Sequence, residues 1–145
     1  GGFRLSAKPL PGVQVFAIAD NVYQDALSRK MILAGIFNNW NTSKLPIQVL
    51  PFSVYLRLTD VVGSLKWCLR LVWLKDSSTL AEFRGETQAS KERLLPTDII
   101  VRIMGMQFEH AGAYALQFFV HESDEFAKEL RVNVTVPKEQ DGAGN

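Results

Sequence analysis

The stretch FSVYLRLTDVVGSLKWCLRLVWL, residues 52–74, decides the fold class. Residues 52–59 alternate apolar with polar side chains, and residues 65–74 repeat the alternation. A period of two predicts strands that turn one face to a core. The segment between them contains Gly63 and supplies a turn. The stretch is therefore predicted to form a β-hairpin.

The same alternation extends outward in both directions from this stretch. Further strands are predicted at 13–20, 30–37, 80–88, 98–106, 114–122 and 130–136. The first two are apolar enough to be central strands of a sheet. Seven or eight short strands with almost no helical periodicity predict an all-β protein, an antiparallel β-sandwich. Gly112, followed by Tyr114 and an alternating strand, resembles the late strands of immunoglobulin-like sandwiches, where such a tyrosine can bond back to the preceding corner.

The length of 145 residues suits one domain. We place this domain at 13–137, after an extended N-terminal segment at 1–12. Residues 89–97 are polar enough for a loop or one helical turn. Residues 138–145 have no apolar side chain large enough to anchor them and are predicted to be disordered.

Charge and cysteine content exclude several classes of function. Sixteen Lys and Arg residues oppose fifteen Asp and Glu residues, and this balance gives no basic face for nucleic acid. No apolar run approaches the ~20 residues that span a bilayer, so no membrane insertion is expected. The single cysteine, Cys68, rules out an internal disulfide and a cysteine-cluster metal site, and it suits a cytoplasmic location. A signal peptide upstream of residue 1 stays open.

Several short motifs together carry a resemblance to a known family. They are Asp20-Asn21, the strand residues 33–37 (LAGIF), Pro51-Phe52, Gly63 and the GAYAL segment at 112–116. In this order they resemble a family of small bacterial proteins of unknown function, over residues 13–136. The resemblance implies a cytoplasmic, immunoglobulin-like β-sandwich without an established activity. It offers no catalytic residue to carry over.

The residue types used in catalysis and metal binding are scattered. Asp20 and Asp25 offer too few oxygen ligands for calcium and are interpreted as turn residues, with a calcium site as the alternative. His110 and His121 lie at opposite ends of one predicted strand, so they cannot share a site. Cys68 is interpreted as a half-buried strand cysteine, although the neighbouring cations leave a reactive thiol conceivable. No catalytic residue, metal or cofactor is predicted.

The segment 37–46 is the strongest candidate binding loop. Asn38, Asn39, Trp40 and Asn41 combine an aromatic platform with amide donors and acceptors, as in sites that bind sugars or peptides. The alternative is that Trp40 is tucked beneath the loop as part of the core.

These observations favour a non-enzymatic binding or scaffolding module. Its partner is an unknown protein or a second copy that pairs through an edge strand. A carbohydrate-binding module that uses Trp40 is the second hypothesis, and an enzyme of unknown class is the third.

Overall fold

The structure, a computed structural model, describes residues 10–89 and 95–137, and in these ranges it contains eleven strands and no helix. The strands are β1 (Gly12–Gln24), β2 (Met31–Phe37), β3 (Asn39–Asn41), β4 (Ile47–Gln48), β5 (Phe52–Thr59), β6 (Ser64–Trp73), β7 (Ser78–Gln88), β8 (Thr97–Ile103), β9 (Gln107–Phe108), β10 (Gly112–Val120) and β11 (Lys128–Thr135).

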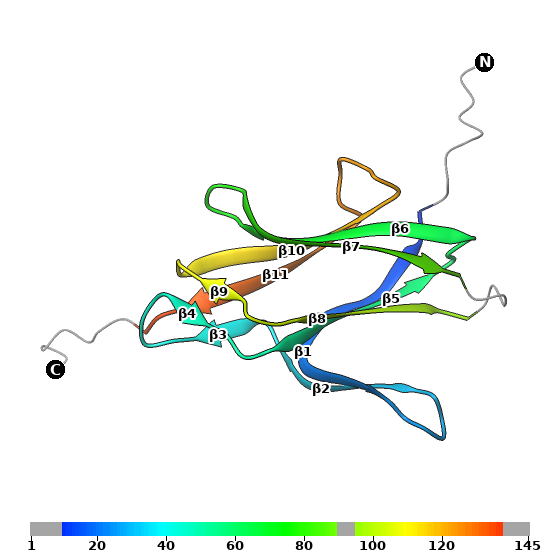
Figure 1. The fold of residues 1–145 in the computed structure, drawn as a ribbon, viewed down its shortest axis with the longest axis horizontal. Coiled ribbons are helices and arrows are strands. Elements are labelled where there is room, and N and C mark those ends of the chain that lie inside the picture. The colour runs from blue at the N-terminus through cyan, green and yellow to red at the C-terminus, as the bar shows by residue number, and fades with distance from the viewer. Residues whose placement is uncertain (1–9, 90–94, 138–145) are drawn as a thin grey trace, which may run out of the picture.

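Two large sheets form the two layers of the molecule (Figure 1). One has the order β2-β1-β5-β8, the other has the order β3-β11-β10-β6-β7, and β4 pairs with β9 in a small third sheet. The predicted all-β class is confirmed. The predicted count of seven or eight strands is wrong, because β3, β4 and β9 are only two or three residues long and too short to show alternation. The purely antiparallel pattern is also wrong, since β3 runs parallel to β11.

The predicted hairpin at 52–74 does not form. The two strands are present, but β5 pairs with β1 and β8, whereas β6 pairs with β7 and β10. The connection crosses from one sheet to the other, with positive φ angles at Asp60 and Gly63 and with Val61 buried at the end of the core. Alternation shows which side chains face a core but not which strands are neighbours. Two strands in opposite sheets, facing each other across the core, have the same pattern as two strands paired in one sheet.

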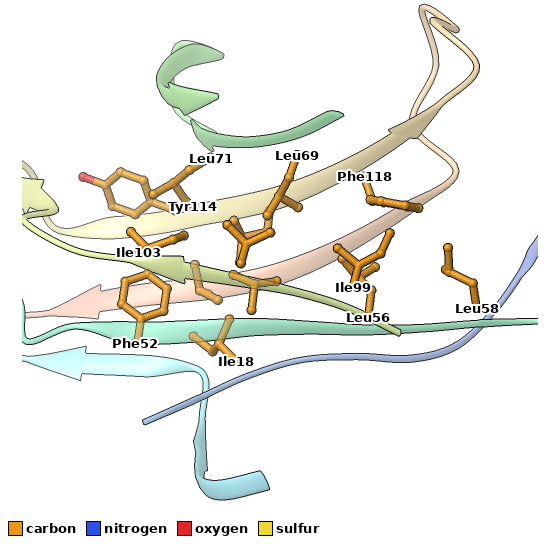
Figure 2. Packing of buried hydrophobic residues seen from close by; sticks show 14 of the residues in the cluster. Ile18, Phe52, Leu56, Leu58, Leu69, Leu71, Ile99, Ile103, Tyr114 and Phe118 are labelled. Carbon is orange, nitrogen blue, oxygen red and sulfur yellow. The ribbon is translucent and has the colours of Figure 1, made fainter. Parts of the chain in front are cut away.

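The core lies between the two sheets and is built from the inward rows of their strands (Figure 2). Phe52 and Leu56 of β5 and Ile99 of β8 face Leu69 of β6 and Phe118 of β10, and all five are buried. The inward positions predicted for β10 (Tyr114, Leu116, Phe118 and Val120) are confirmed, because each is almost fully buried.

Strands β1 and β2 form a hairpin that continues beyond the pairing of β1 with β5 (Figure 1). The predicted first strand ends at residue 20, but β1 reaches Gln24, and only the segment 25–30 forms the turn. β1 is a central strand as predicted. β2 is an edge strand, and its Ile32 and Ile36 are exposed.

The remaining predicted segments fall partly outside the described residues. This applies to residues 1–9 of the N-terminal segment, to 90–94 of the predicted loop and to the tail at 138–145. The predicted strand at 98–106 ends at Ile103 in β8, and a positive φ angle at Gly105 precedes β9. Among the described residues, no helix has the length and apolar character needed to cross a membrane.

Candidate functional site

Trp40 lies in β3, at the edge of the five-stranded sheet, and not in the loop that the sequence predicts. It is partly buried, and its ring packs against Phe37, Phe52 and Phe108 at centroid distances of 5.1, 5.1 and 4.9 Å. A sugar platform needs a free ring face. The carbohydrate hypothesis stays an untested prediction, and this packing counts against it.

The amide groups beside Trp40 take part in the pairing of β3 with β11. Asn39 Nδ2 donates to Asn41 Oδ1 at 2.9 Å, and Thr135 Oγ1 donates to Asn39 Oδ1 at 2.6 Å. The carbonyl of Asn38 accepts from the backbone N–H of Asn133 at 2.9 Å. These bonds explain the asparagine-rich composition of the segment as support for a short edge strand.

The turn interpretation is confirmed for Asp25 by its hydrogen bonds, but it is wrong for Asp20, which lies within β1. One carboxylate oxygen, Oδ2, accepts from the backbone N–H groups of Leu27 at 3.2 Å and Ser28 at 2.6 Å. Ser28 lowers the pKa of Asp25, with a smaller contribution from Leu27. Nowhere in the described residues do three His, Cys, Asp or Glu side chains converge as metal ligands would.

The two histidines flank opposite ends of β10, as the sequence predicts. The ring of His110 stacks on Trp73, with centroids 4.1 Å apart and an angle of 10° between the planes. The backbone carbonyl of His110 accepts a hydrogen bond from Tyr114 Oη at 2.6 Å. This is the corner bond that the sequence pattern around Tyr114 predicts.

A groove of about 540 Å³ lies on the outer face of the five-stranded sheet, over β6 and β7 and beside the β10–β11 connection. Its volume is within the range of small-molecule sites. The lining is Lys66, Trp67, Cys68 and Arg70 from β6; Arg84, Gly85 and Glu86 from β7; Phe119 from β10; and Glu122, Ser123 and Asp124 from the connection. Strand pairing therefore brings together three segments that are distant in sequence.

The floor of the groove is apolar and well packed. Phe119 and Cys68 lie opposite each other in the β10–β6 register and are only 5% and 9% exposed. The guanidinium of Arg70 lies 4.6 Å from the Phe119 ring centroid, and the Phe126 ring packs edge-on against Phe119. Arg70 and Phe126 therefore already cover much of the Phe119 ring, and the partly buried Trp67 is the other aromatic side chain that lines the groove.

Cys68 has little thiolate character. Its Sγ lies 3.5 Å from Glu82 Oε1, and burial first and Glu82 second raise the pKa of the thiol above its usual value. The opposing contributions of Arg70 and Arg84 are smaller. The groove therefore does not provide an activated nucleophile at this position.

Charged side chains surround the floor and are tied together through Glu82. Arg70 Nε donates to Glu82 Oε1 at 2.6 Å, and Arg84 Nε lies 3.4 Å from Glu82 Oε2. The hydrogen bond from Arg70 is the main cause of the lowered pKa of Glu82. A single carboxylate thus serves two guanidinium groups, and the Arg84 side chain stays 64% exposed.

One wall of the groove begins with a strained turn. His121 and Glu122 have φ angles of 54° and 58°, and Ser123 N–H donates to the Val120 carbonyl at 3.1 Å. These are the features of a type I′ turn, in which asparagine and glycine are the favoured central residues. Non-glycine residues cost about 1–2 kcal/mol each in this region. Such strain is frequent where a structure positions groups for a ligand.

The sequence contains part of the signal for this groove. It predicts that Cys68 shares a strand face with Lys66 and Arg70, and two consecutive aromatic residues, Phe118 and Phe119, require that one of them faces outward. The pairing of β6 with β7 and β10 supplies the rest, and no local pattern encodes it.

Comparison with known proteins identifies the family without adding an activity. No curated protein matches the chain. A family of unknown function matches residues 14–135, which include every strand from β2 to β11, most of β1 and the whole lining of the groove. The chain therefore belongs to the DUF6941 family of unknown function.

Proposed function

We propose that the protein is a non-enzymatic binding module and that its ligand occupies the groove over β6 and β7. The observation that supports this most strongly is the groove of about 540 Å³ itself, whose lining combines the partly buried Trp67 with a ring of charged side chains. An apolar surface with a few polar groups around it is the usual composition of a ligand site. The raised pKa of Cys68 supports binding over covalent catalysis.

The finer parts of the classification belong to the same proposal. We propose an immunoglobulin-like arrangement of the two sheets, which the bond from Tyr114 Oη to the His110 carbonyl supports. The parallel pairing of β3 with β11 is a departure from a purely antiparallel sandwich. A cytoplasmic location in a bacterium fits the single cysteine of the chain.

A fragment screen followed by nuclear magnetic resonance tests the groove directly. The ¹⁵N-labelled protein is titrated with a library of small aromatic and aliphatic compounds, and shifted amide signals are mapped onto the structure. We expect a cluster of shifts at Lys66, Cys68, Arg84 and Phe119. Fragments that cluster elsewhere, or that bind nowhere at millimolar concentration, contradict the proposal.

Self-association through β2 is a second candidate function. β7 and β8 are also edge strands, but they carry charged residues such as Glu82 and Asp98, whereas β2 carries none and exposes Ile32 and Ile36. Charged side chains normally protect sheet edges against pairing. Light scattering during size-exclusion chromatography tests this: a dimer that Ile36→Lys dissociates supports it, and a monomer at high concentration refutes it.

A further inference from the structure

Positively and negatively charged side chains lie at different positions along β6. This separation indicates which charged groups a ligand of the groove would carry. The register sets Arg70 opposite Glu82, Cys68 opposite Arg84, and Lys66 opposite Glu86. Alternate residues of a strand share a face, so these three pairs form successive rungs across the groove. The rungs at the two ends are four residues apart on β6, or about 13 Å at ~3.3 Å per residue.

The Arg70 rung and the middle rung, which carries Arg84, together have an excess of positive charge. Glu82 is the partner of both Arg70 and Arg84, so two guanidinium groups share one carboxylate. Arg84 makes the longer contact and is the more exposed of the two. Within the part of the chain that the structure describes, its other N–H groups have no partner, and they can make the paired contact with an anionic group that guanidinium groups favour.

The Lys66 end has an excess of negative charge. Glu86 faces Lys66 across the strands, and the backbone N–H of His121 donates to the Lys66 carbonyl at 2.9 Å, which brings the β10–β11 connection to this end. Glu122 and Asp124 of that connection line the groove. Among the described residues, neither Glu122 nor Asp124 has a hydrogen bond or ion pair, whereas Glu86 accepts a hydrogen bond from Ser64 Oγ. Three carboxylates and one ammonium group therefore line this part of the groove.

We propose that the ligand is a zwitterion with an apolar body, of which a short peptide with free termini is the simplest form. The inference rests on the proposed binding function of the groove. The peptide carboxylate pairs with Arg84, its ammonium group lies among Glu122 and Asp124, and an apolar side chain lies beside Trp67, which lines the groove. An extended tripeptide is about 10 Å long, which falls between the ~7 Å from the Arg84 rung to the Lys66 rung and the ~13 Å from the Arg70 rung to the Lys66 rung.

The test compares four forms of one tripeptide, alanyl-phenylalanyl-alanine: free, N-acetylated, C-amidated and blocked at both ends. Dissociation constants are measured by nuclear magnetic resonance titration at low ionic strength. Because exposed ion pairs contribute little each, we expect each block to weaken binding about threefold to fivefold. Added salt is expected to reduce the difference between free and blocked forms.

Matched variants assign each end. Arg84→Gln is expected to remove the difference between the free and amidated peptides. Arg131→Gln, which alters a 66% exposed arginine paired with Glu129 outside the groove, is expected to leave it unchanged. Glu122→Gln with Asp124→Asn is expected to remove the difference between the free and acetylated peptides, and Glu125→Gln in the same connection serves as its control.

The outcomes separate this inference from the function on which it rests. Equal or tighter groove binding by the blocked peptides overturns the zwitterion but leaves the groove as a binding site. If no peptide binds while fragments still shift the groove signals, the inference alone fails. If neither peptides nor fragments shift those signals, both fail.

Discussion

Tyr114 shows how one side chain fixes the end of a strand. Its ring is 1% exposed and packs against Phe108, while its hydroxyl reaches back four residues to the carbonyl of His110. Burial is the main cause of the raised pKa of Tyr114. The hydroxyl therefore stays a neutral donor at physiological pH, and its role here is to hold the corner before β10.

Tyr114→Phe is expected to destabilise the protein by about 1 kcal/mol, because the bond from the Tyr114 hydroxyl to the His110 carbonyl is lost while the packing of the ring is kept. Urea unfolding followed by circular dichroism measures the change. Tyr23→Phe, at a 52% exposed position in the β1–β2 hairpin, is the control and is expected to change stability by less than about 0.5 kcal/mol. Equal effects of the two substitutions on the free energy of unfolding would show that the hydrogen bond from Tyr114 does not stabilise the corner.

Asp98 links stability to pH. Burial raises its pKa, but hydrogen bonds from Arg57 and Tyr55 outweigh burial and lower the pKa below 3.8. A carboxylate whose pKa is lower in the folded state than in the unfolded state stabilises the fold at pH values above the unfolded-state pKa. That stabilisation is lost as the pH falls through the folded pKa.

Asp98→Asn is therefore expected to lower the free energy of unfolding by about 1–2 kcal/mol at pH 7. The difference from the unaltered protein should shrink as the pH falls below 3.8. Denaturant unfolding at a series of pH values measures it. A difference that stays constant from pH 7 to pH 2 would show that Asp98 is not the linked group.

At the scale of the elements, the turn that follows β10 combines local strain with a place in the groove wall. His121 and Glu122 hold positive φ angles although neither is asparagine or glycine. Asp60, in the connection between β5 and β6, holds a similar angle of 58° and is not part of the groove lining. The two sites allow the relief of strain to be separated from the loss of a ligand contact.

Glu122→Gly is expected to stabilise the fold by about 1 kcal/mol, because relief of the positive φ angle exceeds the added chain entropy of glycine. It should also weaken peptide binding. Asp60→Gly should give a similar increase in melting temperature without an effect on binding. Thermal unfolding measures the stability of both variants, and peptide titration measures their affinity. A destabilised Glu122→Gly protein would contradict the inference that the positive φ angle at Glu122 is strained.

At the scale of the whole molecule, alternation predicts the class and most of the long strands but not their neighbours. The inward-facing residues of β5, β6 and β10 can be predicted from the sequence because apolar side chains recur at every second position. The pairing partners of β5 and β6 cannot be predicted in this way. The chain crosses between the sheets after β5 because β5 pairs with β8 and β6 pairs with β7, and both partners come later in the chain. The strand that contains Trp40 is not predicted for the same reason, because β3 is only three residues long and is defined by its pairing with β11.

The candidate groove is likewise a product of the assembled sheet. Its floor joins Cys68 to Phe119, which are neighbours only through the β6–β10 register. Its charges come from β6, β7 and the β10–β11 connection. Sequence patterning places Lys66, Cys68 and Arg70 on one strand face, but the neighbours that complete the groove are set by the full topology.

The measurement that tests the groove most directly is the rate at which Cys68 is alkylated, because the chain has no other cysteine and the mass change is unambiguous. The raised pKa of the thiol calls for alkaline pH and predicts a reaction slower than that of free cysteine. A saturating groove ligand is predicted to slow the reaction further, in proportion to its occupancy. An alkylation rate that is unchanged at saturation would contradict the assignment of the groove as the binding site.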